Sequence, residues 1–384
     1  MLLDASLLIE KNYKKNRTRI RKVSSNGEYF IDCQSQEQTS LELLQILSEI
    51  KAVIKAYGGS CRKIILQFRI FNPRDKLVYI LLECILYTIM NAYHKQVDMR
   101  VGGLDLNINT EGWRYTPSCA IAQFGYNNEF NLYFQNDFAK NHYRKVLTDP
   151  TDVEAPARLV TDIKTFLDRF HMRDEFDGKL AYTIGELADN ALCHAHTPCL
   201  IDIDITEKDY QATDSEDVYY AVNVVVLNFG EKCLYNDIIE KIEHKYYKTD
   251  SRYIYVEEAY KKQSMHFDKK YGKEEFYLVS TFQDEISGRP NESYSGGTGL
   301  PELIRTLEEY ADEDFCYVLS GHSSLLFKKE MLNFDEDGWI GFNSFGNFLE
   351  EIPDTTCIDS SYTFLPGTGY NFMLIFKGDQ QDGE

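Results

Sequence analysis

Residues 182–192 constrain the fold of this chain more than any other stretch, because they combine a helical pattern with two polar side chains of complementary chemistry. Apolar residues recur there at the spacing of one helix face, namely Ile184, Leu187, Ala188, Ala191 and Leu192. Glu186 and Asn190 stand four residues apart, so on a helix they lie one above the other on a single face. The carboxylate can take a proton and the amide oxygen can bind magnesium, which suits a site that activates water beside a hard cation.

The segment 186–195, ELADNALCHA, resembles the N-box of the GHKL nucleotide-binding superfamily. This superfamily includes gyrase, histidine kinases, mismatch-repair ATPases, anti-sigma-factor kinases and a heat-shock chaperone. The resemblance implies that ATP is the nucleotide, that Glu186 is the catalytic base and that Asn190 holds Mg²⁺. His194 corresponds to the trailing histidine of the box, which either lines the phosphate side of the pocket or packs against its surroundings.

A second partial match follows the apolar strand expected at residues 219–227. That strand ends in Asn228-Phe229-Gly230, at the place where GHKL proteins carry D-x-G-x-G. The resemblance implies that residue 228 accepts a hydrogen bond from the adenine amino group and that Gly230 lets the backbone approach the base. This chain departs from the pattern, since Asn228 replaces the aspartate and Lys232 replaces the second glycine. Asparagine both accepts and donates, so a flipped amide would also satisfy guanine, and we expect a reduced preference for ATP over GTP.

A glycine cluster at residues 293–300, SYSGGTGL, precedes the helix expected at residues 298–310. Consecutive backbone N–H groups at the positive end of a helix suit a phosphate. The cluster resembles the superfamily's G-x-G-x-G box, with Gly297 and Gly299 as the matched glycines and Thr298 between them.

The last match is Gly367-Thr368, with Phe372 four residues beyond the threonine, as in the G-T-x-x-x-F pattern of gyrase-like members. The resemblance implies that the Thr368 hydroxyl shares a water with the adenine-binding residue. Four partial matches in the family's order support a GHKL assignment more strongly than any one of them alone.

The fold class expected from these patterns is α+β. By resemblance, residues 155–384 form a GHKL ATP-binding domain, a two-layer α/β sandwich with helices on one face of a mixed sheet. Residues 231–295 correspond to the ATP lid. Lids of this kind close over the nucleotide and draw on weakly packed segments.

Residues 1–150 are expected to form a smaller α/β domain of unknown role, followed by a candidate linker at residues 149–156. A strand at 63–69, a helix capped by Asn72 and a strand at 97–101 predict a parallel pair. Further short strands are expected at 120–124 and 131–134. The order of these elements is faintly similar to that of a STAS domain, although no residue motif supports the similarity.

The net charge of −20 argues against nucleic acid as the main partner, since binding its backbone requires a positive surface. A basic cluster at residues 11–22 is the exception, and it fits either a solvated arm or a patch for an anionic partner. The most apolar later run, residues 78–92, is interrupted by Glu83 and is too short to cross a bilayer. Nine cysteines without a C-x-x-C pair fit reduced thiols. We therefore expect a cytoplasmic protein that avoids membranes and binds a nucleotide together with another protein or a second copy of itself.

A zinc site is the rival interpretation of residues 193–199, CHAHTPC. Cys193, His194, His196 and Cys199 all have side chains that bind zinc. Their spacing matches no common zinc finger, and helical geometry would separate the two histidines.

Three functions fit the sequence. The main expectation is an ATPase whose lid movement drives a conformational or partner-binding switch. The first alternative is a protein kinase, either a serine/threonine kinase of the anti-sigma-factor type or a histidine kinase, although nothing in residues 1–150 resembles the dimerising helical hairpin of the latter. The second alternative is a nucleotide-sensing module without turnover, which the substituted Asn228 favours and the intact Glu186 disfavours.

Overall fold

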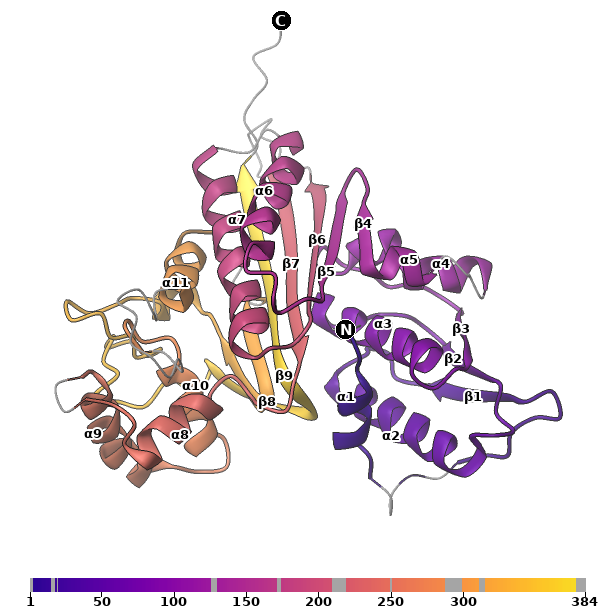
Figure 1. Cartoon of the computed structure of the whole chain (residues 1–384), viewed down its shortest axis with the longest axis horizontal. Helices are drawn as coiled ribbons and strands as arrows, with labels where there is room; N and C mark the ends of the chain where they lie inside the picture. The colour runs from indigo at the N-terminus through magenta and orange to yellow at the C-terminus, as the bar shows by residue number, and fades with distance from the viewer. Residues whose placement is uncertain are drawn as a thin grey trace, which may run out of the picture.

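The computed structural model describes residues 3–14, 18, 20–125, 130–170, 174–208, 219–248, 251–286, 299–310 and 315–377. The fold is α+β, with one parallel and one antiparallel sheet (Figure 1). In this part of the chain, no helix combines the length and the apolar composition needed to cross a membrane.

The first sheet is parallel and has the order β1-β2-β3. Its strands are β1 (Glu28–Cys33), β2 (Lys63–Phe68) and β3 (Gln96–Val101), joined by helices α2 (Ser40–Tyr57) and α3 (Lys76–Asn91), with α1 (Ser6–Lys11) ahead of them. The parallel pairing expected from the strand–helix–strand unit is confirmed. The cap of α3 is Asp75 rather than Asn72, since the Asp75 carboxylate accepts a hydrogen bond from the backbone nitrogen of Val78 at 3.1 Å.

Two strands expected in this region are helices instead. They are α4 (Pro117–Phe124) and α5 (Phe130–Gln135), preceded by the 3₁₀ turn η1 (Glu111–Tyr115). Pro117 occupies the first turn of α4, where proline favours a helix. In α5, Phe130 and Phe134 share one helix face, and Phe134 stacks on Tyr87 of α3 with the ring centres 4.1 Å apart.

The second sheet has the order β4-β5-β6-β7-β9-β8. Its strands are β4 (Asn136–Phe138), β5 (His142–Leu147), β6 (Cys199–Lys208), β7 (Tyr219–Phe229), β8 (Tyr317–Leu326) and β9 (Ile358–Lys377). All five described pairings are antiparallel, so the expectation of a mixed sheet was wrong. Four of the five pairs join strands that are consecutive along the chain, which need no crossover. Strands β4 and β5 precede residue 150, so part of the chain expected in the first domain belongs to this second sheet.

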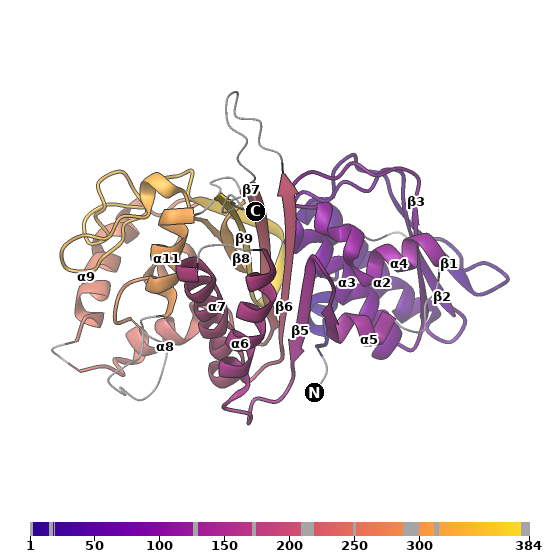
Figure 2. The same ribbon diagram turned by 90° about the horizontal axis from the view of Figure 1, so that it is seen from above.

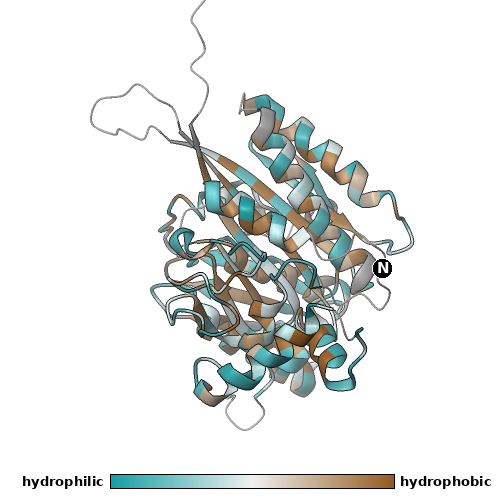
Figure 3. Cartoon of the chain, turned by 90° about the vertical axis from the view of Figure 1, so that its left-hand side faces the viewer, coloured by the Kyte–Doolittle hydropathy of each residue, from teal (hydrophilic) through white to brown (hydrophobic). Residues whose placement is uncertain are grey.

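Helices cover both faces of the second sheet (Figure 2). On one face lie α6 (Ala155–Leu167), α7 (Asp174–Asp189) and α11 (Gly299–Tyr310), with the 3₁₀ turn η2 (Asp168–Phe170) after α6. On the other face, Leu200, Val225 and Leu227 pack into the same core as α3. Alternate residues of β7 therefore point to opposite cores, and the expected two-layer sandwich gains a third layer from the amino-terminal part. The apolar strands and the polar outer faces of the helices are visible in Figure 3.

The described part of the predicted lid is a packed helical unit. It contains α8 (Asn236–His244), α9 (Tyr253–Gln263), the 3₁₀ turn η4 (Ser264–His266) and α10 (Lys273–Ser280). Val256 and Phe276 are fully buried, and Trp339 and Phe348 from the segment between β8 and β9, which also holds the turn η5 (Lys329–Met331), join their core. Phe276 stacks on Phe348 with the ring centres 5.7 Å apart. The described residues between 231 and 286 thus pack into the core of the second sheet, in contrast to the weak packing expected of a lid.

Candidate functional site

Glu186 and Asn190 lie at the carboxyl end of α7. The buried residues Ile184 and Leu187 anchor this helix to the sheet, whereas Glu186 and Asn190 are only partly buried. The helix continues from Asn190 as a π turn, η3 (Asn190–His194), closed by a hydrogen bond from the backbone nitrogen of Ala195 to the Asn190 carbonyl at 3.1 Å. Single π turns inside helices occur often at functional sites, because they widen the helix where a side chain must be displayed.

The Glu186 carboxylate lies against the first residue of α11. A Cβ atom at Gly299 would stand 3.0 Å from Oε2 of Glu186 and 3.3 Å from its Cβ, so a glycine allows this approach. Tyr182 lies one helical turn before Glu186, close enough for the carboxylate charge to act on its phenol. The negative charge of Glu186 and, after it, partial burial raise the pKa of the Tyr182 phenol. The carboxylate therefore sits between an aromatic hydroxyl and the positive end of a helix.

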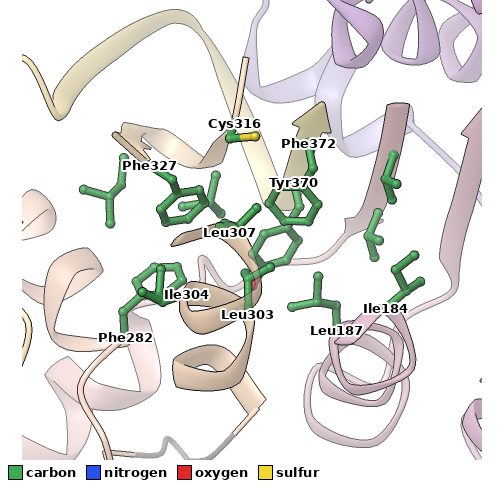
Figure 4. Packing of buried hydrophobic residues seen from close by; sticks show 14 of the residues in the cluster. Ile184, Leu187, Phe282, Leu303, Ile304, Leu307, Cys316, Phe327, Tyr370 and Phe372 are labelled. Atoms are coloured by element: carbon green, nitrogen blue, oxygen red, sulfur yellow. The ribbon is translucent and has the colours of Figure 1, made fainter. Parts of the chain in front are cut away.

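The apolar face of α11 holds its amino end in this position. Leu303, Ile304 and Leu307 are buried against aromatic residues of three neighbouring segments and against α7 (Figure 4). Those neighbours are Phe282, Phe327, Tyr370, Phe372, Ile184 and Leu187. Packing of this density fixes the helix, and with it the position of Gly299 beside Glu186.

Three polar side chains form a row across the end of the second sheet, on the face that α7 covers. Asn228 of β7 is the direct partner of Thr368 on β9, and Thr368 is in turn the partner of Ser320 on β8. Their side chains lie on the same face of the sheet as Val226 and Tyr370, at the end of that row of apolar side chains. Asn228 and Thr368 are buried, each with 7 % exposure, and Ser320 is fully buried.

Two glycines bring the backbones together at this row. Gly367 has φ +108°, and a Cβ atom there would overlap the carbonyl oxygen of Asn228 and lie 3.0 Å from the nitrogen of Gly230. The nitrogen of Gly230 donates to the carbonyl of Pro366 at 3.1 Å. Gly230 therefore lies beside the turn into Thr368, although 138 residues separate Gly230 from Thr368.

Three polar residues of this region were not predicted as site residues. Ser320 accepts a hydrogen bond from the backbone nitrogen of Leu234 at 2.9 Å and donates to the carbonyl of Gly367 at 2.6 Å, so it links the start of the helical unit to β9. Thr197 accepts from the amide nitrogen of Asn228 at 2.9 Å. Tyr182 contacts Glu186. Serine, threonine and tyrosine are too common for a spacing pattern to distinguish them. The register of the strands reveals Ser320, and the hydrogen bond to Asn228 reveals Thr197.

The other predicted residues fall partly outside the description. Gly297 and Thr298 lie outside the described residues, and of His194 only the backbone, within the π turn, is described. Lys232, which stands where the family has a second glycine, forms an ion pair with Glu240 at 3.5 Å and another with Asp237.

Of the four residues in the rival zinc interpretation, the side chains of Cys193 and His194 lie outside the described part of the structure. Among the residues that the structure describes, no group of three or more His, Cys, Asp and Glu side chains is placed to hold a metal ion. Cys199 is buried in β6 with its sulfur near the carbonyl of Leu200, facing the core. Asn190, the residue expected to hold magnesium, is partly buried, and magnesium in proteins commonly uses one or two protein oxygens together with phosphate and water.

A hollow lies on the opposite face of the sheet, between α2 and α3 and the strands β8 and β9. Asp75, Leu77, Tyr317, Leu319 and Leu365 are among the residues that line it. Leu77, Leu319 and Leu365 belong to the amino-terminal core, so this hollow is separated by the sheet from Glu186 and Asn228.

No protein-family model, no curated protein and no solved structure matches this chain. The interpretation of the site therefore depends on its own residues and their arrangement.

Proposed function

We propose that this chain binds ATP with Mg²⁺ in a GHKL-type site and hydrolyses it. The observation that carries the proposal is the contact between Glu186 and the amino end of α11, because it joins a carboxylate to a helix terminus suited to phosphate. Residues from two further predicted boxes, Asn228 and Thr368, are direct partners in the sheet. Motifs that are far apart in the sequence are thus neighbours in two pairs, Glu186 with Gly299 and Asn228 with Thr368. Motifs that bind one ligand must come together in this way.

In this proposal each group has one task. The amino end of α11 binds the terminal phosphates, and Glu186 orients and deprotonates the water that attacks the γ-phosphorus. Tyr182 stands beside the Glu186 carboxylate. Asn228 binds the base, and Thr368 stands beside it.

Asn190 would hold Mg²⁺ through its amide oxygen. The ion, when bound together with the nucleotide, supplies charge neutralisation of the phosphate oxygens.

The test is the pair Glu186→Gln and Glu258→Gln. Glu186→Gln keeps the shape of the side chain but cannot accept the water's proton, so we expect ATP turnover to fall by about 10²-fold or more while ATP affinity changes less than about threefold. Glu258 is exposed on α9 and serves as the matched control with unchanged turnover. Phosphate release and calorimetric titration with ATP measure the two quantities. Full activity in Glu186→Gln would remove the proposed role.

The same preparation separates the alternatives. With ATP labelled on the γ-phosphate, release of free phosphate supports the ATPase. Label transferred to protein supports a kinase, and binding without either product supports a nucleotide sensor. In the ATPase reading, the helical unit formed by α8, α9 and α10 transmits the bound state to a protein partner, and the hydrogen bond from Leu234 to Ser320 ties that unit to the nucleotide end of the sheet.

A further inference from the structure

The inference concerns base selection and rests on the proposed function. We propose that Thr197 orients the amide of Asn228 so that only its oxygen faces the base, and that the site therefore selects adenine over guanine without the family's aspartate. Thr197 acts through Asn228 and is a positioning residue.

The hydrogen bonds of Thr197 determine the orientation of the amide. The Thr197 hydroxyl donates to the carbonyl of Ala191 at 3.3 Å, and the Thr197 backbone nitrogen donates to the same carbonyl at 3.1 Å. A hydroxyl has a single hydrogen, so once it points to Ala191 the oxygen can only accept from its other neighbour. That neighbour is the Asn228 side chain at 2.9 Å, which must present its NH₂ group to Thr197.

The opposite orientation is disfavoured. With the amide flipped, the Asn228 oxygen would face Thr197, and the hydroxyl would have to turn away from Ala191 to satisfy it. Asn228 is 7 % exposed, so water does little to replace a lost hydrogen bond there. A flip that gives up one such bond lowers the population of the flipped amide by about tenfold.

The consequence for the base follows from donor and acceptor chemistry. In the preferred orientation the side chain offers an acceptor, which pairs with the amino group of adenine but meets the O6 acceptor of guanine without a hydrogen between them. Asn228 then behaves as the aspartate does, apart from the charge. The reduced preference for ATP over GTP expected from the sequence is therefore replaced by a retained preference.

The position of Thr197 also depends on Gly230, which was predicted as a site residue from the sequence. A Cβ atom at Gly230 would lie 3.1 Å from the methyl carbon of Thr197, tighter than an ordinary contact. Gly230 thus leaves room for Thr197 as well as for the base. Thr197 also follows the π turn that begins at Asn190, so the turn places the hydroxyl within reach of β7.

The experiment compares the affinities of ATP and GTP in four proteins by calorimetric titration, with thermal unfolding as a check on folding. The wild-type chain is expected to favour ATP by about tenfold or more. Thr197→Val keeps the shape of the side chain but removes the hydroxyl, and we expect it to reduce the ATP-to-GTP affinity ratio by about tenfold. Thr197→Ser keeps the hydroxyl and is expected to keep the ratio.

The fourth protein combines Thr197→Val with Asn228→Asp. A carboxylate only accepts, so it needs no orientation, and its preference for ATP is expected to survive the loss of the hydroxyl. An unchanged ratio in Thr197→Val, with ATP still bound, would overturn this inference and leave the proposed function standing. A wild-type chain that binds neither nucleotide would overturn both. If Thr197→Val does not fold, a ratio lost in Thr197→Ser overturns the inference by itself.

Discussion

Gly367 occupies a backbone conformation that residues with side chains rarely adopt, since its φ is +108°. The space that a side chain would need is already taken by the carbonyl of Asn228. One residue therefore holds β9 against the end of β7 at the point where Asn228 and Thr368 meet. Conformational freedom and close approach both require a glycine here.

Replacing Gly367 by alanine is expected to lower the free energy of unfolding by about 2 kcal/mol or more, because it adds backbone strain and separates two strands. Nucleotide affinity is expected to fall with it. Gly59→Ala is the control, since a Cβ atom at Gly59 would meet no other atom within 4 Å. Urea unfolding of both variants gives the comparison. Equal unfolding energies would show that β9 adapts to the added methyl group.

Thr197 illustrates what the sequence could not provide at this scale. The motif predicted Asn228 as the residue that faces the base, but an asparagine has two orientations with opposite chemistry. The neighbour that decides between them is 31 residues earlier in the chain and contacts it only because β6 and β7 pair. A pattern along the sequence carries no information on that contact.

At the scale of elements, α7 and α11 together form the catalytic corner of the proposed site. The apolar spacing of residues 182–192 predicted the helix, and the glycine cluster predicted a helix after residue 298. The π turn at Asn190 was not predicted, because it depends on a hydrogen bond spanning five residues that competes closely with ordinary helical bonding. The contact between Gly299 and Glu186 was not predicted either, since it arises from the packing of the two helices.

Gly299→Ala is expected to lower ATP turnover by about tenfold while leaving the melting temperature nearly unchanged. The added methyl group would lie 3.0 Å from Oε2 and 3.3 Å from Cβ of Glu186, so the carboxylate would shift and misplace the attacking water. Gly178→Ala on α7 is the matched control, because a Cβ atom there meets nothing and alanine favours a helix. Steady-state turnover at saturating ATP is the measurement. Turnover that is equal in the two variants would place the reacting water away from this corner.

The helices α4 and α5 show where element prediction fails. Short apolar runs such as 120–124 and 131–134 fit a strand and a buried helix equally well by periodicity. The stacking of Phe134 on Tyr87, across 47 residues, favours the helical arrangement. The prediction for the second sheet was wrong for another reason. The resemblance implied a mixed sheet, whereas every described pair is antiparallel.

At the scale of the whole molecule, a buried network of charges joins α3 to β5 and β6. Lys76 forms ion pairs with Asp202, at 2.7 Å, and with Asp204, and Arg144 bridges Asp202 and Glu83. All five side chains are at most 1 % exposed. Breaking such a pair leaves an uncompensated buried charge, which typically costs about 3–5 kcal/mol. These ion pairs therefore stabilise the packing of the amino-terminal part against the second sheet.

Nothing in the sequence indicates the ion pairs that join the amino-terminal part to the second sheet. Glu83 was visible only as an interruption of an apolar run, and a boundary near residue 150 suggested two separate units. In the fold, Glu83 is the counter-charge of Arg144, and its second oxygen accepts a hydrogen bond from the backbone nitrogen of Ser118 at 2.8 Å. Pairing between residues 61 positions apart in the chain cannot be deduced from either residue alone.

His142 makes the stability of this network depend on pH. Its ring nitrogens contact Asp137 and Asp202, each at 2.9 Å. Burial lowers the pKa of His142, but the charge of Asp202 and the two hydrogen bonds outweigh burial and the nearby charge of Arg144, so the pKa is raised above 6.5. A raised pKa means that the folded state binds the proton more tightly than the unfolded state does. The stabilisation is complete below pH 6.5 and is lost as pH rises through the higher value.

We therefore expect the free energy of unfolding to decline above pH 6.5, and His142→Gln to remove that part of the decline. The carboxyl of Asp202 does not contribute to this window. Although burial opposes it, the charges of Arg144, His142 and Lys76 hold its pKa well below its usual value, so it stays ionised throughout. Urea unfolding between pH 6 and 9 measures the slope, with the exposed His322→Gln as control. The same slope in wild type and His142→Gln would contradict the assignment.

The position of β9 also bears on how the chain is made. It comes after the other five strands of its sheet in the sequence, yet it lies inside the sheet, between β7 and β8. Until it emerges from the ribosome, the edge of β7 is unpaired and β8 lacks the strand beside which it lies. β7 ends at Phe229 and β9 at Lys377, so at roughly 5–20 residues per second that edge stays open for about 7–30 s. An open strand edge invites pairing with other chains, so nascent copies of this protein are exposed to association during synthesis at an edge that β9 covers in the finished sheet.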